Sequence, residues 1–196
     1  MKKLIKIGLL SVALLATVVV NASNKLSVKV ASGNSKMLSI SLTEVTLGET
    51  VYIEDFKGEV LFSENLLASD KYNKVFNLSS LPTGVYFIGS KEESKMQVTP
   101  IVINENNVAL IKNSTKTYLA PEVTIDEGVL RVLIGNHNKE KVSIEVYDES
   151  GTLLDSTDSN TNALVYGSYE ISDIESKTIT ISVSEGDCNF TKEFKL

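Results

Sequence analysis

The sequence predicts an all-β protein that forms two antiparallel sandwiches in tandem. Apolar residues alternate with polar ones in short runs, turn-forming residues separate the runs, and two parts of the chain resemble each other. Alternation with a period of two indicates a strand with one buried face. Short strands with a turn about every 8–12 residues are typical of a sandwich, so the core is expected between two sheets.

The alternating runs give the expected strands and their buried faces in chain order. Their apolar members are Leu26, Val28 and Val30; Leu38, Ile40 and Leu42; Val51 and Ile53; Leu130, Val132 and Ile134; Val142, Ile144 and Val146; Ile179, Ile181 and Val183. Turn formers lie between the runs at 32–34, 57–58, 82–84, 104–107, 135–138, 150–151 and 185–187. No run after residue 22 keeps the spacing of an amphipathic helix.

The first 22 residues have the pattern of a cleaved secretory signal peptide. Three lysines precede an apolar run from Ile7 to Val20, and Asn21 and Ala22 follow it before Ser23. The apolar run is shorter than the ~20 residues of a membrane span, and no later window of that length is free of charges. We expect cleavage after Ala22, no membrane span in the mature chain, and an exported protein that is secreted, at the cell surface or in the periplasm.

The net charge bears on the binding partners of the chain, and the cysteine content bears on its disulfides. Removing the three lysines of residues 1–22 changes the formal charge from −6 to −9. An acidic chain is a poor partner for nucleic acid or for an anionic lipid surface. The single cysteine, Cys188, cannot form a disulfide within the chain, and we expect it to be a small buried residue.

Internal similarity sets the domain count at two. Residues 51–62 align with residues 142–154, so that Val51 matches Val142 and Gly58 matches Gly151. Residues 78–81 match residues 171–174 at the same offset. We therefore predict a signal peptide at 1–22, a first sandwich at 23–105 and a second at 106–196, with the boundary in the polar stretch 104–107.

The segment LPTGVY at 81–86 predicts a corner between two strands. Leu81 precedes Pro82, which fixes one backbone angle, and Gly84 is expected to take a conformation that a β-carbon would resist. Tyr86 follows at the start of the next strand. This order resembles the tyrosine corner of immunoglobulin-like domains, in which the ring packs inward and the hydroxyl bonds to the corner backbone.

The same residues carry a family resemblance. The alternating strand at 51–53, the turn at Gly58 and the segment LSSLPTGVYFI at 78–88 resemble the small sandwich domains of exported proteins in type IX secreting bacteria, including their C-terminal sorting domains. The resemblance covers residues 49–103 and implies immunoglobulin-like, or fibronectin-III-like, sandwiches. The second copy has IESKTI at 174–179 in place of the motif, although its closing NFTKEFKL is similar to the last strand of such domains.

The sequence offers no catalytic site, cofactor site or metal site. The sole histidine, His137, lies in a polar turn and has no partner residues for a zinc site or a nucleophilic triad. Four acidic residues that could be considered for a calcium site lie close together, at 148, 149, 155 and 158. Leu153 and Leu154, however, divide them between two sides of a strand. We expect a solvated acidic surface there and a protein that is not an enzyme.

Two further features bear on glycans. The chain has no tryptophan, and its candidate exposed aromatics lie singly on different expected strands, at Tyr52, Tyr118, Tyr147 and Tyr166. Asp155-Ser156-Thr157 resembles a bacterial O-glycosylation motif, so Ser156 is a candidate acceptor.

The expected function is a non-enzymatic adhesion, structural or surface-assembly module that contacts a protein or a glycan, without cofactors. One alternative is a type IX secretion cargo or accessory whose terminal copy is the sorting signal. The other is a carbohydrate-binding module.

Overall fold

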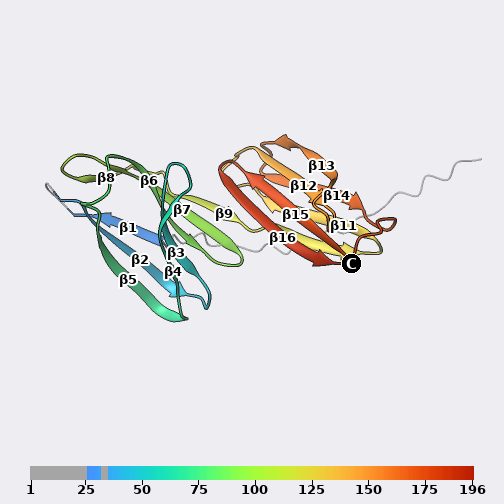
Figure 1. Cartoon of the computed structure of the whole chain (residues 1–196), viewed down its shortest axis with the longest axis horizontal. Coiled ribbons are helices and arrows are strands. Elements are labelled where there is room, and N and C mark those ends of the chain that lie inside the picture. Colours follow the sequence, from blue (N-terminus) through green and yellow to red (C-terminus); the bar gives the residue numbers. More distant parts are fainter. Residues whose placement is uncertain (1–25, 32–34) are drawn as a thin grey trace, which may run out of the picture.

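The computed structural model describes residues 26–31 and 35–196, which form strands joined by turns. The strands make two antiparallel β-sandwiches that lie end to end (Figure 1), as the sequence predicts. The expected signal peptide, 1–22, and its cleavage point before Ser23 lie outside the described residues. Within the described ranges, no helix has the length and apolar character needed to cross a membrane.

The first sandwich contains the strands from β1 to β9. Their bounds are β1 (Leu26–Val30), β2 (Met37–Val45), β3 (Thr50–Asp55), β4 (Val60–Asn65), β5 (Ser69–Asn77), β6 (Gly84–Lys91), β7 (Lys95–Ile103), β8 (Val108–Leu110) and β9 (Lys116–Leu119). One sheet has the order β1-β2-β5 and the other β4-β3-β6-β7-β8. The short strand β9 also pairs with β7, beside the part that β8 leaves open.

The second sandwich contains the strands from β10 to β16. Their bounds are β10 (Glu122–Asp126), β11 (Val129–Gly135), β12 (Val142–Tyr147), β13 (Leu153–Asn160), β14 (Leu164–Glu170), β15 (Thr178–Glu185) and β16 (Cys188–Lys195). Its sheets have the orders β10-β11-β14 and β13-β12-β15-β16. This is the strand order of the first sandwich without β8 and β9, so both copies have one topology.

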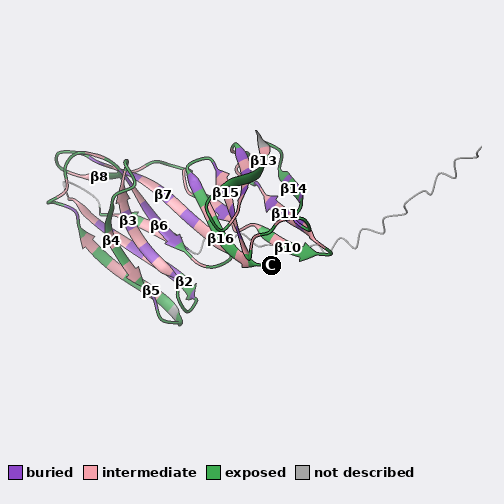
Figure 2. Ribbon diagram, turned by 45° about the vertical axis from the view of Figure 1, so that its right-hand side comes forward, coloured by how far each residue is buried: buried purple, intermediate pink, exposed green. Residues whose placement is uncertain are grey.

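Each sandwich has a core of its own, made by the alternating residues. The first core includes Leu38, Ile40, Val51 and Ile53, and the second includes Leu130, Val132, Ile144 and Ile181. Figure 2 shows the buried residues as bands that alternate along the strands with less buried ones. Alternation places every second side chain between the sheets, which is why a period of two is visible in the sequence.

The two sandwiches also share a hairpin tip. In the β3–β4 turn, Gly58 has a φ of 81° and donates its N–H to the carbonyl of Asp55 at 3.1 Å. In the β12–β13 turn, Gly151 has a φ of 82° and donates to the carbonyl of Asp148 at the same distance. Each aspartate carboxylate accepts the backbone N–H groups two and four residues later. Glycine is favoured at positive φ, which explains the matching glycines.

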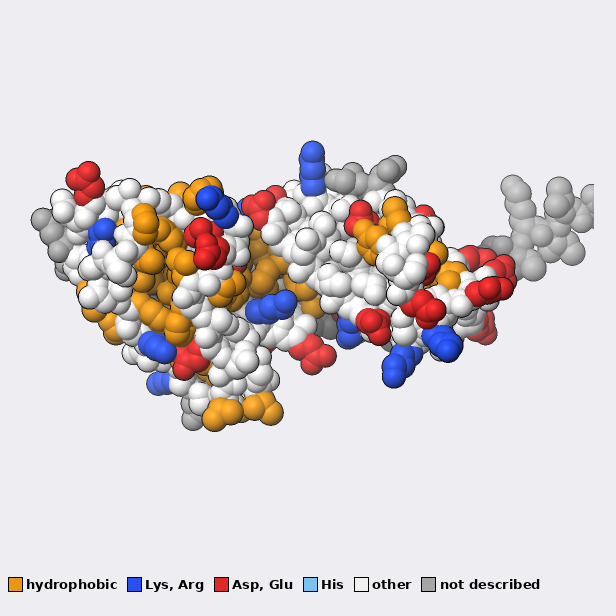
Figure 3. Space-filling view, in the orientation of Figure 1, with side chains coloured by type: hydrophobic (Ala, Val, Ile, Leu, Met, Phe, Trp, Pro, Cys, Tyr) orange, Lys and Arg blue, Asp and Glu red, His pale blue; other side chains and the backbone are white. Residues whose placement is uncertain are grey.

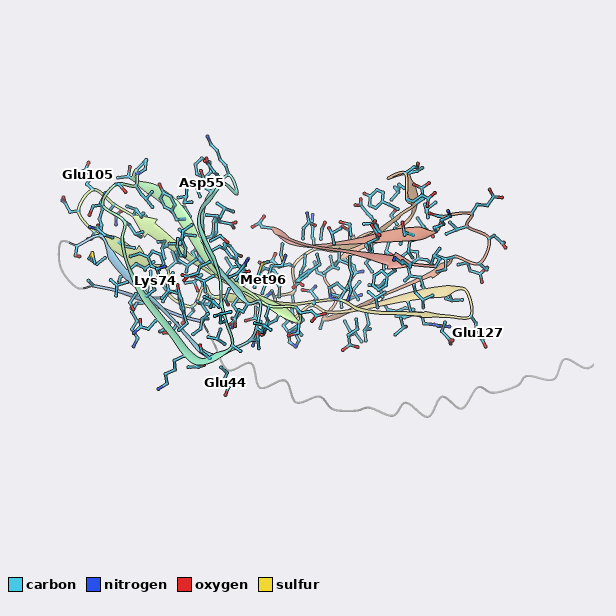
Figure 4. The ribbon with its side chains drawn as sticks, turned by 60° about the horizontal axis from the view of Figure 1, so that its bottom comes forward. Glu44, Asp55, Lys74, Met96, Glu105 and Glu127 are labelled. Carbon is cyan, nitrogen blue, oxygen red and sulfur yellow. The ribbon has the colours of Figure 1, made fainter. Side chains whose placement is uncertain are left out.

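The boundary predicted between residues 105 and 106 is wrong. Residues 104–107 close the β7–β8 hairpin, where the N–H of Asn104 donates to the carbonyl of Asn107 at 2.8 Å. Glu105 lies at the end of the first sandwich that points away from the second (Figure 4). Because β8 and β9 both pair with β7, the chain stays in the first sheet as far as Leu119.

Candidate binding pocket between the two sandwiches

The corner residues lie where the chain passes from β5 to β6. Leu81 packs against the first core, and Pro82 is exposed. Tyr86 is only 6% exposed, and its hydroxyl donates to the carbonyl of Pro82 at 3.0 Å. The ring therefore fills the core while its hydroxyl ties the crossing segment to β6, as in a tyrosine corner.

Gly84 does not have the role that the sequence predicts. It is absent from the residues with positive φ, and a β-carbon there would lie 3.7 Å from the Tyr86 ring, an ordinary contact. Because neither the backbone nor the space demands glycine, the expected need for an unusual angle at this position is wrong. Pro82 and Tyr86 carry the corner.

The other residues singled out in the sequence lie apart from one another. His137 is exposed in the β11–β12 turn, with its Nδ1 atom 3.2 Å from the carbonyl of Gly135. Ser156 is exposed on the edge strand β13, where its N–H donates to the carboxylate of Asp155. The carboxylate of Asp148 accepts backbone N–H groups within its own turn. Among the described residues, no cluster of three or more metal-ligating side chains is present.

The outer face of the sheet that contains β3 carries a patch that the sequence does not make obvious. Strand register brings side chains from β3, β6, β7 and β9 into three rows on the face opposite the core. The rows are Tyr52, Gly89, Val98 and Lys116; Glu54, Phe87 and Pro100; and Lys91, Met96 and Tyr118. Residues far apart in the chain thus become neighbours. Figure 3 shows hydrophobic side chains gathered on the first sandwich and toward the second.

Gly89 allows Tyr52 to lie across the sheet. A β-carbon at Gly89 would come within 1.9 Å of the Tyr52 ring, so the ring occupies the space above this residue. Its hydroxyl then reaches the sulfur of Met96 on β7 at 3.2 Å. Met96 is in turn the register partner of Tyr118 on β9. One glycine therefore lets a side chain from β3 span β6 and join the aromatic surface near β9.

A pocket of about 460 Å³ lies over this surface, where the two sandwiches meet. Its apolar walls include Tyr52, Phe87 and Met96 from the first sandwich. Asp187, in the β15–β16 turn, and Cys188, the first residue of β16, line it from the second. Figure 4 shows Met96 on the side of the first sandwich that is turned toward the second. The volume falls within the ~300–1,000 Å³ that is common for small-molecule sites, which often lie between domains.

The charged side chains of the pocket are three carboxylates and two lysines. Glu54 stands on the pocket wall, and burial, with a smaller effect of the adjacent Asp55, raises the pKa of its carboxyl. Asp55 and Asp187 add two further carboxylates. Lys116 also lines the pocket, but it forms an ion pair with Glu140 of the second sandwich at 2.6 Å. Its positive charge is therefore already matched.

Cys188 is buried, as the sequence predicts, but it lies at the junction and not deep in a core. It is 4% exposed, and burial raises the pKa of its thiol to about 12. Nearby carboxylates, Glu185 first, raise this pKa further, while Lys91 opposes them. A thiol with so high a pKa is protonated at neutral pH and is a poor nucleophile or metal ligand.

Contacts between the sandwiches hold the pocket walls together. Besides the ion pair of Lys116, the amide of Asn138 donates to the carbonyl of Thr117 on β9 at 2.7 Å. Tyr118 is only 4% exposed, and burial raises the pKa of its hydroxyl, with Cys188 as the next cause. Strand β9 thus contacts the second sandwich through Lys116 and Thr117.

Comparison with known families bears on the first sandwich. Residues 17–104 match the family described as the secretion system C-terminal sorting domain. This match contains the segment 49–103 on which the sequence resemblance was based, so the resemblance is confirmed. The sorting-domain-like sandwich is the first one, and the match ends before β8.

Solved structures with some similarity belong to several kinds of protein. They include the BSP domain of a biofilm associated protein (13% identity, TM-score 0.29), alpha-2-macroglobulin from Escherichia coli spanning domains MG0-NIE-MG1 (10%, 0.27) and chicken CNTN1 FN1-FN3 domains (13%, 0.26). The alignments cover 87%, 88% and 86% of this chain, but only 29%, 64% and 63% of the respective structures. No curated protein matches the chain.

The pocket combines residues that the sequence treats as unrelated. Tyr52 and Tyr118 are expected to be single aromatics on different strands, yet both line this pocket. The signal that could have linked them is the outer-face register, because Tyr52 and Phe87 occupy the positions that alternate with the core residues of β3 and β6. The pairing of β9 with β7 could not be read from the second copy, which has no equivalent strand.

Proposed function

We propose that the protein is an exported cargo of a type IX secretion system that acts, without catalysis, as an adhesion or assembly module at the cell surface. The observation that carries this proposal is the match of residues 17–104 to the secretion system C-terminal sorting domain. The predicted signal peptide supports the first export step. The exposed position of His137 and the high pKa of the Cys188 thiol support a non-catalytic role.

Export can be tested with the tagged full chain in a type IX secreting bacterium and in a strain whose secretion channel is inactive. We expect the protein on the surface or in the medium of the first strain and in the periplasm of the second. The same location in both strains would contradict the proposal.

A second export experiment separates the two copies. Deleting residues 121–196 removes the second sandwich but keeps β8 and β9. If the first sandwich carries the sorting information, the shortened protein is still exported. The alternative, in which the terminal copy is the sorting signal, requires retention in the periplasm.

The surface contact itself is proposed to be with a protein or a glycan, and the pocket between the sandwiches is the surface best suited to it. Its aromatic walls fit either kind of partner. A role as a carbohydrate-binding module requires that a glycan bind to the mature chain and that Tyr52→Ala abolish the binding. A glycan array with both proteins tests this.

A further inference from the structure

We propose that the pocket between the sandwiches binds an organic cation on an apolar stem, either the side chain of a lysine or arginine in a partner protein or a free alkylamine. This inference rests on the proposed function because it names the chemistry of the surface contact. Three features support it: the shape of the pocket, an unmatched carboxylate in its wall, and a filled version of the same arrangement elsewhere in the molecule.

The walls suit a flexible apolar stem that ends in a charge. Tyr52, Phe87 and Met96 present aromatic and thioether surface around a volume of about 460 Å³. Lysine and arginine bury their methylene groups along such surface while the charged end remains near polar groups. A cation over an aromatic face is also attracted by the electron density of the ring.

Glu54 supplies the unmatched negative charge. Its carboxylate has no hydrogen bond or ion pair with any other described residue, and its pKa is raised by burial, with no compensating effect from a cation. Lys116 is held by Glu140, and the ammonium of Lys57 lies over the Phe56 ring, 5.6 Å from its centre. A half-buried carboxylate beside aromatic walls is stabilised by a cation that enters the pocket.

The first sandwich already contains this arrangement with its cation in place. Between the edges of its two sheets, the ammonium of Lys74 lies 2.8 Å from the carboxylate of Glu64 and 4.6 Å from the centre of the Phe62 ring. The hydroxyl of Tyr72 donates to the same carboxylate at 3.0 Å. Figure 4 shows Lys74 on the first sandwich, well away from Met96. The pocket also offers a carboxylate, a ring and a tyrosine, but its Tyr52 hydroxyl contacts the Met96 sulfur instead of the carboxylate, and no lysine among the described residues lies on Glu54.

The binding test uses the mature chain with its methionine methyl groups labelled for NMR. The probe is n-butylammonium, and n-butanol is the neutral control of similar size. We expect saturable shifts of the Met96 methyl signal with n-butylammonium and much weaker effects with n-butanol. Equal responses to the two probes would show an apolar pocket without charge selectivity and would overturn the proposal.

Two variants test the site itself. Glu54→Gln keeps the size of the side chain but removes its charge, and it should weaken n-butylammonium binding by about tenfold or more. Phe87→Leu keeps the carboxylate but removes the ring, and it should also weaken binding. Glu170→Gln changes an exposed glutamate on β14 and should leave binding unchanged. Unchanged affinity in Glu54→Gln would contradict the proposal.

A further binding experiment, with a peptide, distinguishes a lysine side chain of a partner protein from a free alkylamine. Acetyl-Gly-Lys-Gly-amide is compared with the matched norleucine peptide and with n-butylammonium. Tighter binding of the lysine peptide than of the free amine points to a partner protein, whereas equal or weaker binding points to a free alkylamine. Shifts of Met96 with neutral sugars, and none with the cations, would overturn the proposal in favour of a glycan site.

Export provides a separate readout. Glu54→Gln should reach the surface as the unchanged protein does, because the substitution is isosteric and lies outside both cores. Failure of export in every variant and in the unchanged chain would contradict the proposed function without bearing on cation binding. Loss of cation binding with normal export would contradict only the inference about the pocket.

Discussion

The hydroxyl of Tyr86 makes one hydrogen bond, and the contribution of this bond to stability depends on how exposed its acceptor is. The acceptor, the carbonyl of Pro82, belongs to an exposed residue, so water can replace the hydroxyl when it is removed. The net contribution of such a bond is about 0.5–1.5 kcal/mol, less than that of a bond to a fully buried group.

Tyr86→Phe should therefore reduce the free energy of unfolding of the first sandwich by about 0.5–1.5 kcal/mol, whereas Tyr86→Ala should cost roughly 3–5 kcal/mol because it leaves a cavity. Urea denaturation measures both changes. Tyr166→Phe on β14 is the control, since Tyr166 is 54% exposed. No effect of Tyr86→Phe on stability, together with loss of surface attachment, would place Tyr86 in a binding site instead.

Glu185 is a second residue whose environment has a measurable consequence. Its side chain is 0% exposed, and one carboxylate oxygen has no hydrogen-bond partner among the described residues. Burial raises the pKa of Glu185; the charge of Glu140 raises it further, while the amide of Asn138 and the charge of His137 lower it. The folded protein thus binds this proton more tightly than the unfolded chain does.

Because the pKa of Glu185 is raised in the folded state, protonation of this carboxyl stabilises the fold. The contribution is complete below the pKa of the unfolded chain, near 4.5, and is lost as the pH rises through the folded pKa. Glu185→Gln removes this dependence. We expect the variant to gain stability over the unchanged protein between pH 4 and pH 7, reaching on the order of 1–3 kcal/mol. Urea midpoints of the variant and of the unchanged protein across this range measure the difference. A flat difference for Glu185→Gln would contradict the prediction.

At the scale of the strand, Gly89 on β6 determines how Tyr52 lies. A β-carbon at this position would overlap the Tyr52 ring at 1.9 Å, and the ring would have to leave the surface above β6. The pocket would then lose a wall, and the contact with Met96 would break.

Gly89→Ala should displace the Tyr52 ring and lower stability by about 1–3 kcal/mol, the usual cost of overpacking. The Met96 methyl signal in NMR should move, since an aromatic ring leaves its neighbourhood. Gly84→Ala is the matched control on the same strand, because its β-carbon has room and its φ is not positive. If both variants behave alike, Tyr52 does not depend on Gly89.

The strands themselves were the most predictable part of the fold. Val51 and Ile53 on β3, and Val142 and Ile144 on β12, are all buried, because alternation is a local property that survives into the sheet. Gly84 was misread because a turn next to proline does not by itself require positive φ. The outer-face rows could not be predicted in the same way, since they depend on which strands pair and in what register.

At the scale of the whole molecule, the domain boundary was the main error of sequence reasoning. A polar stretch such as 104–107 indicates a turn equally well between two domains and between two strands of one sheet. Internal similarity could not correct this, because β8 and β9 have no counterpart in the second sandwich. The two short strands cover the edge of β7, and β9 also meets the second sandwich.

This organisation predicts different behaviour for two fragments. Residues 23–120 contain the complete first sheet and should fold as a monomer. Residues 23–106 lack β8 and β9, so the edge of β7 is uncovered and can pair with another chain. We expect lower stability and self-association for the shorter fragment, as measured by denaturation and sedimentation. Equal stability and a monomeric state for both fragments would show that β8 and β9 do not protect this edge.

The β3–β4 turn of the first sandwich and the β12–β13 turn of the second have the same backbone hydrogen bonds. Asp55 and Asp148 hold their turns with the same set of hydrogen bonds, while the residue that follows differs: Phe56 is 68% exposed, and Glu149 accepts a bond from the backbone of Lys177. The backbone of the tip therefore constrains the aspartate and the glycine and leaves the residues between them free to diverge. Loops grafted between these anchors should be accepted by either sandwich, which gives one scaffold two independent places to acquire new recognition.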